Sequence, residues 1–408
     1  MFNLGGIGRA FSERNFRIYT IGSITSWISF FIQLLAINWL TWELTKSTTW
    51  LAIITFLDIA PNFIFVPIGS ALADRIDRIR IVVITHILAL LQALALAVLA
   101  LTGQITIFSL AILVFLHGLI HSFSVPSLYG ILPRVISKEN LSSAIAVNSA
   151  YTHLSLFIGP IIAGILIAKF HISAAFFANV IGYLIYLISI GFLRIPKEEP
   201  RSQIGRGIFA DILEGWYHII RHTGIGPMLL LAFIGNAISN SLFNLLPAFA
   251  DIVFGKGVDG LTILMASAGL GAGIGALWLA YQGLSERTTI RSLVSFLIVI
   301  LSVALFVSTK NYLFGTLFIL IFGAATEIRS TGIVTLIQNS VDDEKRGRVM
   351  GAYFLIHRAS SAFGILIIGT AADHFGLFYP IIVMLIICFA IWLWIFRSRQ
   401  EIHRAFFE

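Results

Sequence analysis

The chain has 408 residues, of which 58% are hydrophobic and only 12% are charged, and its mean hydropathy is +0.94. A soluble domain of this length carries about 25% charged residues, so the composition excludes an ordinary soluble protein and indicates an integral membrane protein. The formal net charge is +7, and the single cysteine, Cys388, excludes a disulfide framework and a thiolate metal site.

Apolar stretches long enough to cross a bilayer recur along the whole chain. A span needs about 20 mostly apolar residues, because an α-helix rises about 1.5 Å per residue. Backbone groups in lipid must also be hydrogen-bonded within their own helix. We therefore predict an all-α membrane protein with twelve transmembrane helices. They are expected at 17–40, 49–73, 81–102, 105–132, 142–168, 173–194, 224–250, 259–284, 290–308, 312–338, 349–372 and 378–397.

Lysine and arginine are distributed unevenly between the predicted loops. If both termini are placed in the cytoplasm, 21 of the 27 basic residues fall on the cytoplasmic side. The opposite side keeps only Lys46, Lys169, Lys256 and Lys310. This asymmetry is typical of the positive-inside distribution. It predicts a multi-pass protein with both termini cytoplasmic, whose basic side contacts anionic lipid and not nucleic acid.

The longest polar segment lies between the sixth and seventh spans. Pro196 and Pro200 break its start, and residues 206–222 place their apolar side chains on one helical face. This pattern predicts an amphipathic helix on the cytoplasmic membrane surface. A plain linker helix is the alternative.

The two halves of the chain align at a constant offset of 205 residues, which pairs Gly159 with Gly364 and Gly164 with Gly369. Parallel repeats of this kind place a substrate site near the bilayer midplane, between the halves. The expected organisation is an N-terminal six-helix bundle at 1–194, a linker at 195–223 and a C-terminal six-helix bundle at 224–408.

Five charged residues are clustered in "SALADRIDRIR", residues 70–80, directly after the second span. Asp74 can pair with a cation or a helix N-terminus of the other half when the cytoplasmic ends of the halves meet. We predict a conformational latch in which such a pair forms in one state and breaks in the other. Its residues are Asp74, Arg75, Arg78 and Arg80. Ordinary solvated charges that end a span are the alternative.

A second motif, "SLFIGPIIAG" at residues 155–164, combines small residues with a proline inside the fifth span. Gly159 and Gly164 allow helices to approach closely, and Pro160 introduces a kink. Close packing alone would explain these residues. The alternating glycines of "GLGAGIGAL", residues 269–277, also predict close helix packing.

These motifs resemble those of the major facilitator superfamily. "SALADRIDRIR" resembles its loop between the second and third spans, although Ser70 and Asp77 replace two glycines and Ile79 replaces a basic residue. "SLFIGPIIAG" resembles its antiport motif, which assigns that role to Gly159, Pro160 and Gly164. "DDEKRGRVMGAY", "LPRVISKENLSSAIAVNSA" and "ADILEGWYHIIRH" resemble the enterobactin-exporter-like and macrolide-efflux-like branch. The resemblance implies alternating access, with the first, fourth, seventh and tenth spans around a central cavity.

Four charged residues stand inside predicted spans, where charges are expensive and indicate function. Glu327, near the middle of the tenth span, is the predicted proton-coupling carboxylate, and Asp58 is the second candidate. Arg329 and Arg358 are predicted to bind an anionic substrate. A static Glu–Arg pair that fixes the tenth and eleventh spans is the alternative.

Uncharged polar residues in the spans are further candidates for the substrate site. His117 and His121 are four residues apart and therefore share a helical face. The remaining candidates are His153, Asn236, Asn240 and Gln33. Hydrogen-bonded packing between helices is the alternative, and no metal site is expected.

Together these features predict a transporter and not an enzyme. The expected activity is export of a small, partly anionic solute across the bacterial inner membrane in exchange for protons, with a siderophore as the leading substrate. Multidrug or macrolide-type efflux, and import of a siderophore or lysophospholipid, are the alternatives. The expected partners are the solute, protons and membrane lipid. We expect a monomer without a cofactor.

Overall fold

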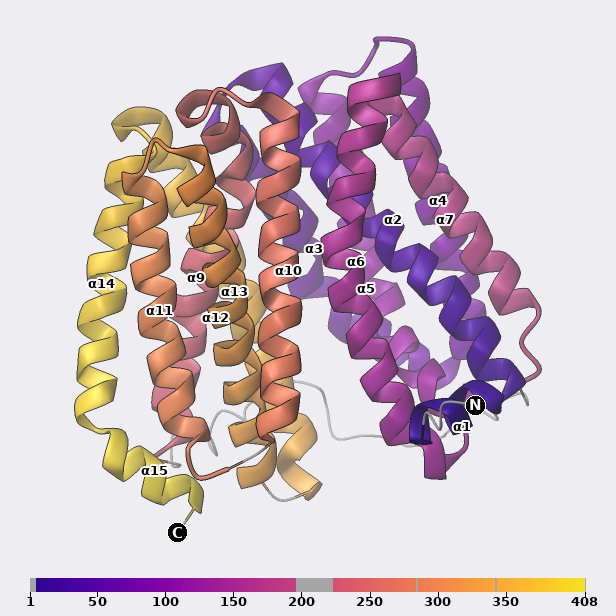
Figure 1. The fold of residues 1–408 in the computed structure, drawn as a ribbon. Coiled ribbons are helices and arrows are strands. Elements are labelled where there is room, and N and C mark those ends of the chain that lie inside the picture. Colours follow the sequence, from indigo (N-terminus) through magenta and orange to yellow (C-terminus); the bar gives the residue numbers. More distant parts are fainter. Residues whose placement is uncertain (1–4, 196–222, 284, 342, 408) are drawn as a thin grey trace. The chain divides into compact units, whose positions relative to one another are not determined.

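The computed structural model describes residues 5–195, 223–283, 285–341 and 343–407, without the side chains of Asp74, residues 343–348 and Phe407. Across this part of the chain the structure is helical and contains no strand. Twelve of the described helices are long and apolar enough to cross a membrane, which confirms the predicted all-α membrane fold (Figure 1). The amphipathic helix predicted at 206–222 lies outside the described residues.

The first six spans follow a short N-terminal helix, α1 (Gly5–Ser12). They are α2 (Arg14–Thr45), α3 (Thr48–Arg75), α4 (Arg78–Leu101), α5 (Ile107–Val135), α6 (Leu141–Phe170) and α7 (Ile172–Gly191). A single turn, η1 (Lys138–Asn140), precedes α6.

The second set of spans starts at α9 (Ile225–Ala248), which continues into the short π-helical turn η2 (Phe249–Val253). The others are α10 (Gly257–Gln282), α11 (Thr288–Ser308), α12 (Tyr312–Ser340), α13 (Asp343–Phe375) and α14 (Phe378–Arg397). The described chain ends in α15 (Arg399–Phe407).

Several helices extend past the predicted apolar stretches. The first span, expected at 17–40, runs from Arg14 to Thr45. Helical hydrogen bonding does not end where apolar composition ends, because capping groups decide the terminus. Thr106 and Ser109 form such a capping box before α5, and Asn311 accepts hydrogen bonds from the first backbone nitrogens of α12.

The helices form two compact units. Unit 1 comprises Met1–Lys46 and Leu57–Gln203, and unit 2 comprises Ser47–Phe56 and Ile204–Glu408. Within unit 2, the carboxylate of Asp373 caps the start of α3, since it accepts hydrogen bonds from the backbone nitrogens of Thr48 and Thr49 at 2.7 and 3.0 Å. The expected bundle boundaries at 194 and 224 stay a prediction.

Equivalent helices pack together in each unit, as the internal repeat predicts. In unit 1, α2 packs on α6 and α7, and in unit 2, α9 packs on α13 and α14. A Cβ on Gly118 of α5 would lie 2.2 Å from the backbone oxygen of Asp58, on α3. A Cβ on Gly323 of α12, 205 residues further on, would lie 2.2 Å from the backbone oxygen of Ala268, on α10. The same two helix crossings therefore depend on glycine in both units.

Candidate functional site

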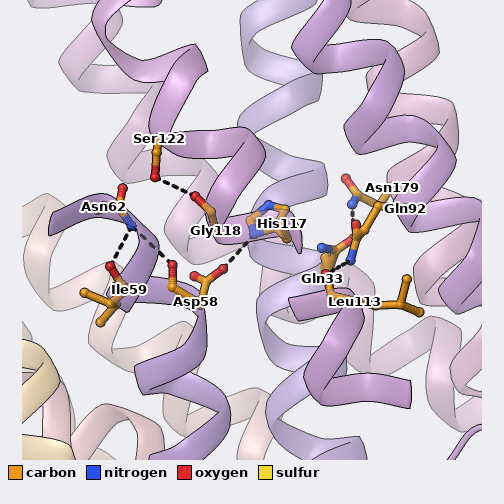
Figure 2. Close-up of polar contacts among 10 residues, drawn as sticks. All are labelled: Gln33, Asp58, Ile59, Asn62, Gln92, Leu113, His117, Gly118, Ser122 and Asn179. Atoms are coloured by element: carbon orange, nitrogen blue, oxygen red, sulfur yellow. Dashed lines mark hydrogen bonds and ion pairs between the residues drawn. The ribbon is translucent and has the colours of Figure 1, made fainter. Parts of the chain in front are cut away.

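The carboxylate of Asp58 and the imidazole of His117 are in direct contact within unit 1. Oδ1 of Asp58 lies 2.8 Å from Nδ1 of His117 and joins α3 to α5 (Figure 2). Each residue lies ten positions after the first residue of its helix, Thr48 or Ile107, which is about 15 Å along the axis. The two groups meet inside apolar helices, well away from the helix ends, where ionisable residues are costly and point to function.

The backbones of the two helices are close enough at this point to hold the pair. Gly118 follows His117, and only a residue without a side chain permits its approach to the backbone oxygen of Asp58. One turn along α3, the Asn62 amide donates to the backbone oxygens of Asp58 and Ile59 at 3.2 and 3.0 Å. Pro61, inside the same helix, has no amide hydrogen to donate. The bonds from Asn62 stabilise the helix beside that interruption.

The hydrogen in the contact can be assigned from the chemistry of the two groups. An ionised carboxylate only accepts, so Nδ1 of His117 carries the hydrogen. The side chain of His117 is 8% exposed and that of Asp58 is 36% exposed. The pair has one negative charge when the imidazole is neutral, and no net charge once Nε2 is also protonated. It can therefore take up and release one proton while the bond between the helices persists.

Two aromatic rings lie against the imidazole of His117. The His121 ring stacks with its centroid 6.1 Å away, which confirms that the two histidines share a face of α5. The Phe30 ring, on α2, stacks at 6.4 Å. No group of three or more His, Cys, Asp or Glu residues suited to a metal ion occurs among the described residues. His153 is half-buried on α6.

Gln33, predicted to bind substrate, is buried in unit 1. Its side-chain oxygen accepts a hydrogen bond from the amide of Asn179, on α7 (Figure 2). This bond joins two helices, as in the packing alternative for the polar residues. A role of Gln33 in substrate binding stays a prediction. The sequence did not single out Asn179, because a lone asparagine in an apolar span forms no periodic pattern.

Glu327 lies near the middle of α12 in unit 2 and is half-buried. Its Oε1 accepts a hydrogen bond of 2.6 Å from the hydroxyl of Thr331, one turn further along the same helix. The carboxylate therefore lies within one of the apolar helices of unit 2. Proton coupling by Glu327 stays a prediction.

Arg329 is fully buried inside unit 2. Its Nη2 donates to Oδ1 of Asn236, on α9, at 2.9 Å, and its guanidinium lies 5.8 Å from the centre of the Phe296 ring. Nε and Nη1 have no hydrogen-bond partner in the described part of the chain. A Cβ on Gly235 would lie 2.5 Å from Nη1, so α9 accommodates the guanidinium because this position is glycine. A contact between Arg329 and substrate stays a prediction.

Asparagines recur every four residues along α9, at Asn236, Asn240 and Asn244. Asn240 and Asn244 each donate to the backbone oxygen one turn earlier, at 3.0 and 2.9 Å. Asn236 is buried beside Arg329, and Asn240 is half-buried. Asn240 and Asn244 therefore hydrogen-bond to their own helix, and Asn236 accepts a hydrogen bond from the buried arginine. Contact of these amides with substrate stays a prediction.

Arg358 is half-buried on α13, and no hydrogen bond or ion pair joins its side chain to another described residue. A guanidinium presents five donors in a planar fork that matches carboxylate, catecholate or phosphate oxygens. Arg358 therefore has its donors available for an anion. Its neighbour His357 is also half-buried.

The predicted latch is only partly described, because the side chain of Asp74 lies outside the described residues. Arg75 and Arg80 are exposed. Arg78 packs on Gly130 of α5, where a Cβ would lie 2.7 Å from its Cδ. Asp77 caps α4 by accepting a hydrogen bond from the backbone nitrogen of Ile79, and its carboxylate forms a 3.6 Å ion pair with Arg134. The aspartate that departs from the motif thus connects the loop to α5, whereas the latch itself stays a prediction.

The residues of the antiport-like motif, Gly159, Pro160 and Gly164, are buried on α6. A Cβ on Gly159 would lie 3.1 Å from the backbone oxygen of Ile28, on α2. At the equivalent position of unit 2, a Cβ on Gly364 would lie 2.8 Å from the backbone oxygen of Ala237. Close helix packing is therefore a property of both positions, and a role in antiport stays a prediction.

A polar contact that the sequence did not suggest joins the start of α2 to the segment before α6. The Glu13 carboxylate accepts hydrogen bonds from the backbone nitrogen and hydroxyl of Ser137 at 2.9 and 2.7 Å, and from the Asn140 amide at 2.9 Å. Burial acts to raise the pKa of Glu13, but these hydrogen bonds outweigh it and hold the pKa below its ordinary value. At neutral pH the carboxylate is therefore ionised. Its hydrogen bonds to Ser137 and Asn140 form a clamp between the start of α2 and the segment before α6.

Twelve apolar helices in two units, with ionisable side chains inside the spans, are typical of a membrane transporter. A family model described as a transmembrane secretion effector matches residues 9–402, so the chain belongs to this family, within the major facilitator superfamily of transporters. Both the family and the fold are those of transporters and not of enzymes.

Two exporters are among the relatives of this chain. Macrolide efflux protein A of Streptococcus pyogenes is 23% identical over 384 residues, which cover 92% of this chain and 94% of the relative. The enterobactin exporter of Escherichia coli is 24% identical over 338 residues, covering 83% of this chain and 79% of the relative.

Solved structures share the fold at lower identity. A bacterial homologue of the human lysosomal transporter Spinster, in an inward-facing and unoccupied conformation, has a TM-score of 0.73 at 13% identity and covers 96% of this chain and 97% of its own. The nucleoside transporter NupG has a TM-score of 0.70 at 11% identity, covering 96% and 99%.

Proposed function

We propose that the protein is a proton-coupled secondary transporter that exports a small, partly anionic solute, with a siderophore as its substrate. It acts by alternating access as a monomer in the bacterial cytoplasmic membrane, with both termini in the cytoplasm and its basic loops at anionic lipid. The direction of transport is supported by the two relatives named above, one an efflux protein and the other an exporter.

The single observation that carries the anionic substrate is Arg358. This guanidinium is half-buried inside a span without a hydrogen bond or ion pair to another described residue. An arginine kept in such a place is costly unless a ligand or water satisfies its donors. A catecholate or carboxylate oxygen would do so with strong, charge-assisted hydrogen bonds.

The other predicted solute-binding residues have different environments. His121, His153 and Asn240 are half-buried and remain proposed contacts. Arg329, Asn236 and Gln33 are bonded inside their units, so contact with a solute requires that helices move apart. Their part in transport is then to bind in one conformation and to pack in the other.

The proton is proposed to bind at a carboxylate inside a span, and Asp58 and Glu327 are the two candidates. Both lie well away from the ends of their helices. Protonation removes a charge from the low-dielectric interior, which changes the relative free energies of the two conformations. The antiport-like motif and the latch, comprising Asp74, Arg75, Arg78 and Arg80, are proposed to take part in the change.

Macrolide-type or multidrug efflux is the second candidate function. The macrolide efflux protein and the enterobactin exporter match this chain at similar identity. The match to the macrolide efflux protein covers more of this chain, 92% against 83%. A macrolide substrate would be expected to use the carboxylates rather than Arg358. Import of a siderophore or lysophospholipid would use the same arginines with the opposite direction.

The test is a deletion strain grown with limiting iron. We expect siderophore to accumulate inside the cells and to fall in the medium, with recovery on expression of the full chain. An unchanged secretion profile together with increased sensitivity to a macrolide would reject siderophore export and support macrolide-type efflux.

A further inference from the structure

We propose that Asp58 and His117 together form the proton-binding site of this transporter, with the transported proton held on Nε2 of His117. The inference rests on the proposed function and identifies which of its two candidate carboxylates takes part. It also assigns His117 to proton binding, although the sequence suggested contact with the solute.

The contact between Asp58 and His117 joins two helices. The bond of 2.8 Å connects α3 to α5 (Figure 2). Since the backbones also touch beside the pair, at Gly118, a change in charge there acts directly on the contact between two helices.

The atoms of the pair allow one proton to bind without loss of this contact. Nδ1 carries the hydrogen that it donates to Asp58, and the structure gives Nε2 no hydrogen bond to another described residue. When a proton binds to the lone pair of Nε2, a pair with one negative charge becomes a neutral ion pair. When the site opens to water, the proton leaves from the same nitrogen.

The surroundings favour a change between these two forms. His117 is 8% exposed, and a net charge inside a span is costly, so the neutral form is preferred where water is excluded. The titratable groups near the pair include His121 of α5 and Tyr183 of α7. The ring that α2 contributes, Phe30, does not titrate.

The first test needs no substrate. The full chain is labelled with ¹⁵N-histidine, placed in lipid nanodiscs, and titrated by NMR between roughly pH 5 and pH 8, the range in which imidazoles change charge. His117→Gln identifies the signal of His117. We expect that signal to show the Nδ1–H tautomer at high pH and to titrate at Nε2, and we expect Asp58→Asn to move its midpoint by roughly one pH unit or more.

Glu327→Gln is the matched control and should leave the His117 signal in place. An Nε2–H tautomer in the wild type, or a midpoint that Asp58→Asn leaves unchanged, would overturn the proposal. If Asp58→Asn does not fold, the tautomer and titration of the wild-type signal decide the question alone.

The second test measures coupling in proteoliposomes with radiolabelled enterobactin as the probe. We expect Asp58→Asn and His117→Gln to retain exchange of the probe across the membrane but to lose accumulation driven by a pH gradient, while Arg399→Ala, at an exposed residue of α15, retains both. Accumulation that persists in both unit 1 variants would refute the assignment and leave proton-coupled transport intact. If the wild type does not move enterobactin, the proposed substrate fails, and the NMR titration still decides the proton site.

Discussion

Arg329 donates a hydrogen bond of 2.9 Å from Nη2 to Oδ1 of Asn236, and so joins α12 to α9 inside unit 2. The arginine is fully buried and the asparagine is buried. Because two other guanidinium nitrogens have no partner among the described residues, Asn236 is an important acceptor for this charge.

Asn236→Ala is therefore expected to destabilise the protein. Loss of a hydrogen bond to a buried charged group costs about 1.5–3 kcal/mol, which thermal unfolding of the purified protein in detergent would detect as a lower midpoint. Asn240→Ala, one turn away and half-buried, is the control and should cost less. The double variant Asn236→Leu, Arg329→Met removes both partners of the hydrogen bond. It should lower the free energy of unfolding by less than the sum of the losses caused by Asn236→Leu alone and Arg329→Met alone. Equal effects of the two alanine variants would contradict this account of the buried arginine.

The alternating glycines of α10 offer a second matched pair. A Cβ on Gly271 would lie 2.0 Å from the backbone oxygen of Leu320, on α12, whereas a Cβ on Gly273 would meet nothing within 4 Å. Gly271→Ala should destabilise by about 1–3 kcal/mol, because the two backbones must move apart. Gly273→Ala should be neutral or stabilise by up to about 1 kcal/mol through helix propensity. A melting midpoint lowered equally by both changes would show that α10 and α12 do not pack as described.

The hydrogen bonds of Glu13 should make the free energy of unfolding depend on pH. Its pKa in the folded protein lies below the ordinary value of 4.5. Its contribution to the free energy of unfolding is therefore fully present above pH 4.5 and is lost as the pH falls through the folded pKa. Glu13→Gln should melt at a lower temperature than the wild type at pH 7, and the difference should shrink below pH 4.5. A difference that stays constant over this pH range would rule out the clamp to Ser137 and Asn140.

Arg358 provides the test of substrate chemistry. Arg358→Ala should weaken binding of enterobactin by about 10–100-fold, the equivalent of a lost charge-assisted hydrogen bond, and should leave binding of a macrolide unchanged. Equilibrium binding of both labelled compounds to the purified protein measures this. Arg399→Ala, at an exposed arginine of α15, is the control for net charge. An equal loss for both compounds would remove the anion-binding role.

The fold was predictable because lipid restricts the chain to helices of a known minimum length. Each of the twelve expected apolar stretches corresponds to a described helix. The 205-residue repeat was also visible, since Gly159 and Gly364 each allow a close helix approach in their own unit. What the sequence lacked was the position of each helix end, because capping residues such as Asp77 lie outside the apolar pattern.

The partners of the polar residues could not be predicted in the same way. Asp58 and His117 stand 59 residues apart on different helices, and helical periodicity relates only residues of one helix. The sequence accordingly assigned one to protons and the other to the solute. The same limit applies to Arg329, since a charge inside a span can face a cavity or the interior of its own bundle.

Everted membrane vesicles that contain the full chain test the central claim most directly. When respiration acidifies the lumen, radiolabelled enterobactin should accumulate inside the vesicles, and a protonophore should abolish that accumulation. Accumulation that survives the protonophore and instead requires added ATP would contradict proton-coupled export.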